Sequence, residues 1–107
     1  MTDRNTADKL AEAKSILFRQ GWHQRSYVKN YTDYKTSPVC LMGALYMTVW
    51  GKPWPGGTAM ARVRPLMAAV AKQIPPGRLI DDWNDDPATT LTDVCGVLDA
   101  AIRDCNA

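Results

Sequence analysis

The chain lacks the sequence features that mark several large classes of protein. No apolar run approaches the ~18 residues of a membrane span, and the polar start MTDRNTADK is not the start expected of a signal peptide. No repeat, linker or low-complexity tract interrupts the chain. With 107 residues, 46% of them hydrophobic and 22% charged, the chain is predicted to form a single globular domain at 1–107, with residues 1–5 frayed.

Cysteines are few, and their positions exclude the commonest cysteine-based sites. No two of Cys40, Cys95 and Cys105 have the Cys-x-x-Cys spacing of zinc and redox centres. On one helix, Cys95 and Cys105 would lie ~15 Å apart, beyond the reach of a disulfide. The sequence therefore predicts free thiols, a cytoplasmic location and no cofactor.

The small net charge of +2 conceals an uneven distribution. Residues 1–78 carry 12 Lys and Arg against 4 Asp and Glu, whereas residues 79–107 carry 1 against 7. Tyr27, Tyr31 and Tyr34 lie among the basic residues, so nucleic-acid binding through the basic body is one alternative function. The basic residues are spread along the chain without a recognised binding motif, which favours a solvated face instead.

Hydrophobic periodicity predicts a mainly α fold of about four helices, with a small β-hairpin between the first two. The helices are expected at residues 7–20, 40–50, 58–74 and from 91 onward, with one further turn near 79–83 and the hairpin within 22–34. Pro65 either kinks the third helix or begins a shorter one. The last helix follows a sequence resembling a capping box, and we expect it to pack on the apolar helix at 40–50 through Leu91, Val94, Leu98 and Ile102.

Cys40 is a candidate nucleophile because it stands at the start of the predicted helix at 40–50, where unpaired backbone N–H groups favour a thiolate. His23 is then the candidate base and Asn84 or Asp85 the candidate orienting group, as in Cys–His–Asn enzymes. The alternative interpretation is that Cys40 is a small apolar residue packed in the first turn of a buried helix. A small Cys-dependent enzyme is thus an alternative function.

Asp82, Asn84 and Asp86 have the spacing of the first three ligands of a calcium loop. Pro87 occupies the next position, where such a loop needs a glycine with positive φ. We therefore predict that the chain has no metal site. Asp82, Asn84 and Asp86 are the candidate ligands against which this prediction is made. The alternative is a structural turn in which Trp83 enters the core and Asn84 or Asp85 hydrogen-bonds backbone N–H groups.

Trp50 and Trp54 flank a turn rich in glycine and proline, and Tyr31 and Tyr34 lie in the polar stretch before it. Aromatic side chains on a rigid turn are good interface anchors because they lose little entropy on binding. These four residues are the predicted partner-binding site, although aromatic residues of a small domain can equally belong to its core.

Three segments, in this order, carry a resemblance: Gly21-Trp22-His23-Gln24-Arg25-Ser26-Tyr27, Cys40-Leu41-Met42-Gly43-Ala44-Leu45 and Trp83-Asn84-Asp85. Together they resemble a family of small uncharacterised proteins from actinobacteria and their phages, for which no activity is known. The resemblance implies a cytoplasmic protein, phage-encoded or actinobacterial, that acts on a host component. We therefore expect a non-enzymatic protein that binds a host protein and no membrane.

Overall fold

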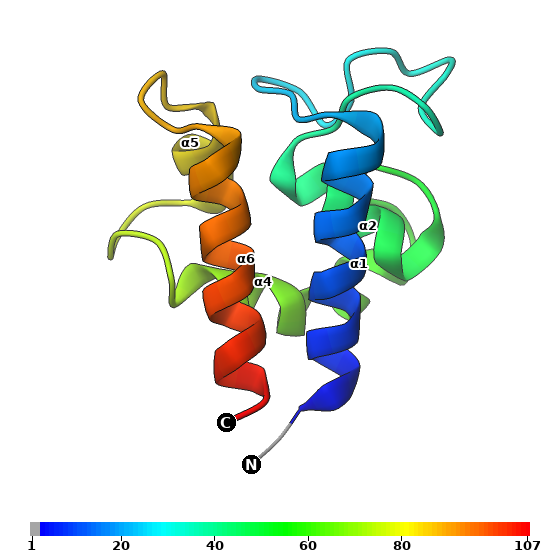
Figure 1. Cartoon of the computed structure of the whole chain (residues 1–107). Coiled ribbons are helices and arrows are strands. Elements are labelled where there is room, and N and C mark those ends of the chain that lie inside the picture. Colours follow the sequence, from blue (N-terminus) through cyan, green and yellow to red (C-terminus); the bar gives the residue numbers. More distant parts are fainter. Residues whose placement is uncertain (1–2) are drawn as a thin grey trace.

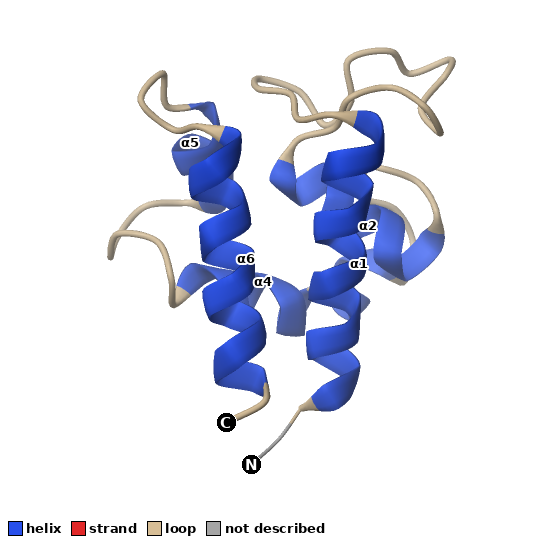
Figure 2. Ribbon diagram, viewed as in Figure 1, coloured by secondary structure: helices blue, strands red, loops and turns tan. Residues whose placement is uncertain are grey.

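The computed structural model describes residues 3–107, which form a layered arrangement of helices joined by loops (Figures 1 and 2). The predicted mainly α class is confirmed. Within residues 3–107, no helix combines the length and apolar character required to cross a membrane. The helices are α1 (Arg4–Gln20), α2 (Leu41–Trp50), α3 (Ala59–Arg62), α4 (Arg64–Ala71), α5 (Ile80–Asp85) and α6 (Leu91–Cys105).

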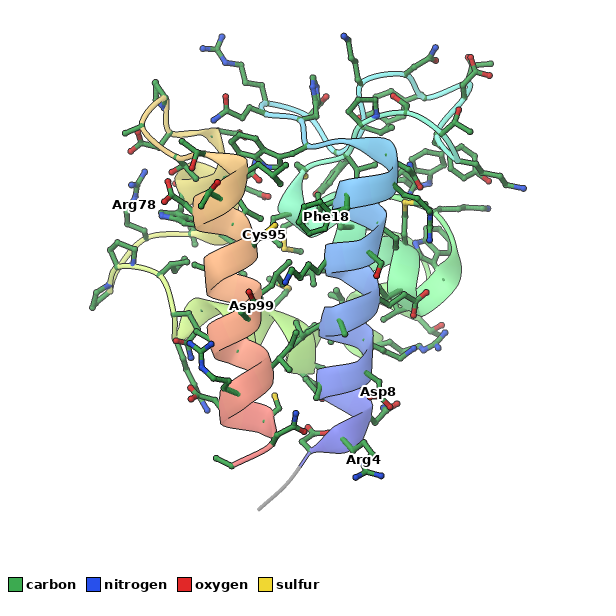
Figure 3. The ribbon with its side chains drawn as sticks, in the orientation of Figure 1. Arg4, Asp8, Phe18, Arg78, Cys95 and Asp99 are labelled. Atoms are coloured by element: carbon green, nitrogen blue, oxygen red, sulfur yellow. The ribbon has the colours of Figure 1, made fainter. Side chains whose placement is uncertain are left out.

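Helix α1 begins at Arg4, before the predicted start at residue 7, because its N-cap is Asp3. The Asp3 carboxylate accepts hydrogen bonds from the Thr6 N–H at 3.1 Å and from the Thr6 hydroxyl at 2.7 Å. Arg4 and Asn5, which were expected to fray, therefore belong to a capped first turn, whereas Met1 and Thr2 lie outside the described residues. Exposed Arg4 marks this end of α1 in Figure 3.

The β-hairpin predicted within 22–34 is wrong. Only two isolated bridges occur there, one from Trp22 and one from Val28, and both reach Val39. The segment just before α2 therefore lies between the two parts of the predicted hairpin, one at 22–23 and the other at 27–28. The Val39 carbonyl accepts a hydrogen bond from the His23 N–H at 2.9 Å, and the Cys40 N–H donates to the Tyr27 carbonyl at 3.0 Å. Because the two halves pair with this segment and not with each other, residues 23–27 form a loop.

The helix predicted at 58–74 is divided at Val63 into α3 and α4. Pro65 lies in the first turn of α4, where its missing N–H costs no helical hydrogen bond. Of the two roles considered for Pro65, the structure thus shows the start of a shorter helix.

Helix α6 does not pack on α2 as predicted. Its main contacts are with α1 and α4, and α1 in turn packs against α2, which crosses behind it in Figure 1. The α6 side chains of Val94 and Leu98 are fully buried, as expected, but Leu91 and Ile102 are only half-buried. An ion pair between Lys14 and Asp99 at 2.8 Å also joins α1 to α6. The capping box predicted at the start of α6 is present.

Candidate functional site

The side chain of Asn84, on α5, is the centre of a buried network of hydrogen bonds, and its residue is only 1% exposed. Its Oδ1 accepts from Trp22 Nε1 at 2.8 Å and from the Leu41 N–H at 3.0 Å. Its Nδ2 donates to the His23 carbonyl at 3.3 Å and to Asp85 Oδ1 at 2.9 Å. Both donors and both lone pairs of the carboxamide are therefore used. We call Asn84 and these four partners the hub.

The loop after Trp22 is fastened to α5 by two further residues. Gln24 Nε2 donates to the carbonyls of Asn84 at 2.9 Å and Asp86 at 3.0 Å, and the Arg25 N–H donates to Asp85 Oδ1 at 2.7 Å. Arg25 has a φ of 81° and is the one non-glycine residue with positive φ among residues 3–107. A left-handed backbone costs an L-residue about 1–2 kcal/mol, so the bonds to α5 hold this loop in a strained form.

Cys40 is the N-cap of α2, and its Sγ accepts a hydrogen bond from the Gly43 N–H at 3.2 Å. The residue is 4% exposed. Burial raises the pKa of the Cys40 thiol to about 12, although the Gly43 N–H opposes this rise. At neutral pH the side chain is therefore a thiol and not the thiolate that acts as a nucleophile.

The three residues predicted as catalytic lie in one region but do not form a relay. The imidazole of His23 shares a hydrogen bond of 2.8 Å with the Ser26 hydroxyl through Nε2. Among residues 3–107, no hydrogen bond joins this ring to the Cys40 thiol or to the Asn84 carboxamide, which meets only the backbone carbonyl of His23. The Asn84 carboxamide thus orients backbone segments, and the His23 imidazole is hydrogen-bonded to Ser26 instead.

The candidate metal ligands Asp82, Asn84 and Asp86 do not converge. The Asp86 carboxylate accepts from the Ala88 N–H at 2.8 Å and pairs with Arg78 at 3.0 Å, and these contacts lower its pKa, the Ala88 bond contributing most. The oxygen of Asn84 belongs to the hub. Within residues 3–107, no group of three or more His, Cys, Asp or Glu side chains could hold a metal ion.

The four aromatic residues predicted to bind a partner come together, and we call them the aromatic cluster. Tyr31 stacks on Trp54 with ring centroids 5.6 Å apart, and Tyr34 meets the same ring edge-on at 5.0 Å. Trp50 Nε1 donates to the Trp54 carbonyl at 2.8 Å. Tyr31 is 54% exposed, and the other three are half-buried. The cluster joins the loop before α2 to the turn after it.

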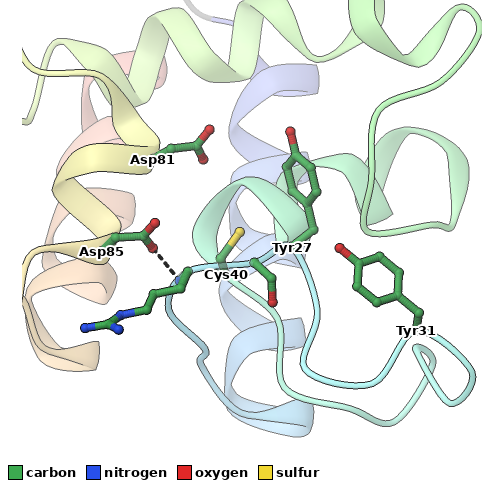
Figure 4. Close-up of a pocket in the computed structure, with 7 residues that line it drawn as sticks. Tyr27, Tyr31, Cys40, Asp81 and Asp85 are labelled. Atoms are coloured by element: carbon green, nitrogen blue, oxygen red, sulfur yellow. Dashed lines mark hydrogen bonds between the residues drawn. The ribbon is translucent and has the colours of Figure 1, made fainter.

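A hollow of about 320 Å³ lies between α5 and this loop, next to the hub. In Figure 4, Asp81 and Asp85 on α5 face Tyr27 and Tyr31 across it, with Cys40 between the two sides. The hollow is lined by Arg25, Ser26, Tyr27, Tyr31, Cys40, Asp81 and Asp85. The aromatic cluster and the hollow therefore share Tyr31.

The two carboxylates of the hollow have no positively charged partner. The ion pairs within residues 3–107 are Lys14–Asp99 and Arg78–Asp86, and neither includes Asp81 or Asp85. Loss of hydration raises the pKa of Asp81, and the negative charges of Asp85 and Asp82 raise it further. The hollow therefore disfavours the negative charge that it carries.

The sequence contains a signal for this site in the spacing of two aspartates. Asp81 and Asp85 are four residues apart, so a helix at this position places both carboxylates on one face. In the sequence, Tyr27 is distinguished only as one aromatic residue among basic ones. The single turn predicted near 79–83 ends before Asp85, whereas α5 includes it, so the predicted turn does not place the two carboxylates on one helix.

Comparison with known families places the chain among its relatives. The sequence model of a family of unknown function (DUF6197) matches residues 1–104. The chain belongs to this family. A family of unknown function was predicted from the motifs, and membership of one is confirmed. No curated protein and no solved structure matches the chain.

Proposed function

We propose that this DUF6197 protein acts by binding another protein, through the face that carries the aromatic cluster and the hollow. The observation that carries the proposal is the position of Tyr31, which is 54% exposed, stacked on Trp54, and part of the hollow's lining. An exposed aromatic side chain that is already held by a neighbour loses little entropy on association. The partner is a cytoplasmic protein, and a host protein if the gene belongs to a phage.

This face suits a protein partner better than a nucleic acid. Asp81 and Asp85 would repel a phosphate backbone, on which nucleic-acid affinity largely depends. The buried Cys40 thiol, with its raised pKa, also lacks the activation that a cysteine nucleophile needs. Shape and aromatic surface remain, and these are features of protein recognition.

The proposal is tested by capture of proteins from an actinobacterial lysate on the immobilised full chain, with and without nuclease. The variants are Tyr31→Ala, which removes the exposed ring of the cluster, and Phe18→Ala as the matched control. Phe18 is 65% exposed on α1 and lies outside both the cluster and the hollow (Figure 3). Both changes remove one exposed aromatic ring, so a difference between them reports on the site.

We expect a protein that the native chain and Phe18→Ala retain after nuclease treatment and that Tyr31→Ala loses by at least about tenfold, as an interface anchor would. Capture that nuclease abolishes would overturn the proposal in favour of nucleic acid. Equal capture by Tyr31→Ala and the native chain would overturn it as well.

A further inference from the structure

We infer that the hollow binds the guanidinium group of an arginine side chain presented by the partner protein. The inference rests on the proposed function and names the group that the site recognises. A hollow of about 320 Å³ is at the lower limit of the range of about 300–1,000 Å³ for ligand sites. It therefore suits the end of one side chain better than a large ligand.

The first ground is the supply of free carboxylate oxygens. Asp85 Oδ1 accepts from the Arg25 N–H and from Asn84 Nδ2, which fixes the orientation of the carboxylate. Its Oδ2, and both oxygens of Asp81, accept no hydrogen bond from residues 3–107. A guanidinium presents five N–H donors in one rigid plane, so it can bond two carboxylates at once.

The second ground is the opposite wall. Tyr27 and Tyr31 line the side that faces the carboxylates (Figure 4), and their positions are fixed by other aromatic rings. Tyr27 meets Tyr46 edge-on at 6.0 Å, and Tyr31 stacks on Trp54. A planar cation can stack on such rings while it bonds the carboxylates. The ammonium of a lysine is compact and strongly hydrated, and it lacks this planar fit.

The third ground is the sulfur of Cys40, which lines the hollow although the residue is only 4% exposed. Its Sγ accepts the Gly43 N–H, and its S–H donates to no group among residues 3–107. A guanidinium has no acceptor for this S–H, so the thiol contributes a small, polarizable and uncharged wall to the hollow and not a hydrogen bond.

The chain's own arginine at the hollow does not neutralise the carboxylates. Arg25 is exposed and lines the hollow, but no ion pair joins its guanidinium to Asp81 or Asp85. Its backbone N–H, and not its side chain, meets Asp85. The negative charge of the hollow therefore remains available to a cation from outside.

The test is a titration of the intact chain with N-acetyl-arginine methylamide, followed by the amide NMR signals of Arg25 and Gly43. We expect saturable shifts with a dissociation constant on the order of 1 mM, as befits one side chain. N-acetyl-citrulline methylamide has nearly the same shape without the charge, and should bind at least about tenfold more weakly. The lysine analogue should bind about threefold more weakly.

Asp81→Asn is the informative variant because the Asp81 side chain makes no hydrogen bond or ion pair within residues 3–107. It should weaken arginine binding at least about fivefold. Asp82→Asn removes the same charge from the next residue of α5, outside the hollow, and should change binding less than about twofold. Equal binding of arginine and citrulline, or unchanged binding by Asp81→Asn, would overturn the inference.

The outcome can be separated from that of the proposed function. If Tyr31→Ala loses a captured protein while the arginine probe leaves the NMR signals unchanged, protein binding stands and the arginine assignment fails. If the probe binds as described but no captured protein depends on Tyr31, the proposed protein interface fails.

Discussion

The hub and the hollow are built from the same three segments, namely the loop that begins at Trp22, the start of α2, and α5. Their polar groups nevertheless differ in whether they have hydrogen-bond partners. In the hub, the Asn84 carboxamide is 1% exposed and both of its donors and both of its lone pairs are bonded. In the hollow, one helical turn away, Asp81 has no partner among residues 3–107 and the adjoining Cys40 thiol has an unused S–H. Asp85 belongs to both, with one oxygen bonded in the hub and the other free.

The contrast separates residues that hold the structure from residues that are free to act. A fully bonded buried amide contributes specificity and stability, and its polar atoms have nothing left for a ligand. Unpaired charges beside it cost stability in the free protein, and a partner of opposite charge recovers that cost. Substitutions in the two regions should therefore affect stability in opposite directions.

The largest expected effect is in the hub. Asn84→Ala removes four hydrogen bonds and leaves the Trp22 indole N–H and the Leu41 N–H without their acceptor. Leaving a buried donor unpaired costs about 1–3 kcal/mol, so we expect a loss of about 3–4 kcal/mol, measured by urea unfolding. Asn84→Asp keeps the shape but cannot donate to the His23 carbonyl, and should also destabilise.

The matched control is Asp82→Asn, on the same helix. Its carboxylate belongs to neither region, and a change at such a surface site alters the free energy of unfolding by at most about 0.5 kcal/mol. If Asn84→Ala unfolds at nearly the same urea concentration as the native chain, the hub does not hold the three segments together.

The next effect concerns the contact that positions Tyr27 for the hollow. A Cβ on Gly43 would come within 2.4 Å of the Tyr27 carbonyl oxygen, whereas a Cβ on Gly96, in α6, would meet nothing within 4 Å. Gly43→Ala should therefore destabilise the chain by about 2–3 kcal/mol, as overpacking does. Gly96→Ala should stabilise it by up to about 1 kcal/mol through helix propensity alone. The same sign for both variants in thermal unfolding would contradict this assignment.

Much of the fold could be predicted from the sequence because it depends on local rules. The capping box at Thr90 and the glycine stop at Gly21 lie where hydrogen bonding near in sequence decides the outcome. The loop at 22–34 could not be predicted in this way, because its alternating pattern favours a hairpin. In the structure, Trp22 and Val28 instead form their β-bridges with Val39, outside this stretch. The packing of α6 on α1 could not be predicted either, because α1 and α2 both offer apolar surface and hydrophobic periodicity does not show which of them α6 contacts.

The site shows the same division. The aromatic cluster was predicted because Trp50 and Trp54 are close in sequence and lie in an evident turn. The hollow could not be predicted because Tyr27 and Asp81 are brought together by bonds between residues far apart in sequence, those of Trp22, Gln24 and Arg25 to the segment of α5. The sequence predicts that Asn84 hydrogen-bonds the backbone, but two of its partners, the Leu41 N–H and the His23 carbonyl, are distant backbone groups that no side-chain motif reveals.

The smallest expected effect is in the hollow and has the opposite sign. Because the pKa of Asp81 is raised in the folded chain, the folded state holds this proton more tightly than the unfolded state does. The stability contributed by Asp81 therefore falls as the pH rises from its ordinary pKa through its raised one, and the cost persists at neutral pH.

Asp81→Asn removes that cost, so the variant should be more stable than the native chain at neutral pH. The gain should be less than about 1 kcal/mol, because water screens the exposed carboxylate. It should disappear in acid, where Asp81 is protonated in both states. Thermal unfolding at several pH values, beside Asp82→Asn, measures this difference. A variant that gains stability while it loses affinity for arginine would mark Asp81 as a residue kept for binding at the expense of the fold. A loss of stability at neutral pH would instead assign Asp81 to the hub's structural role.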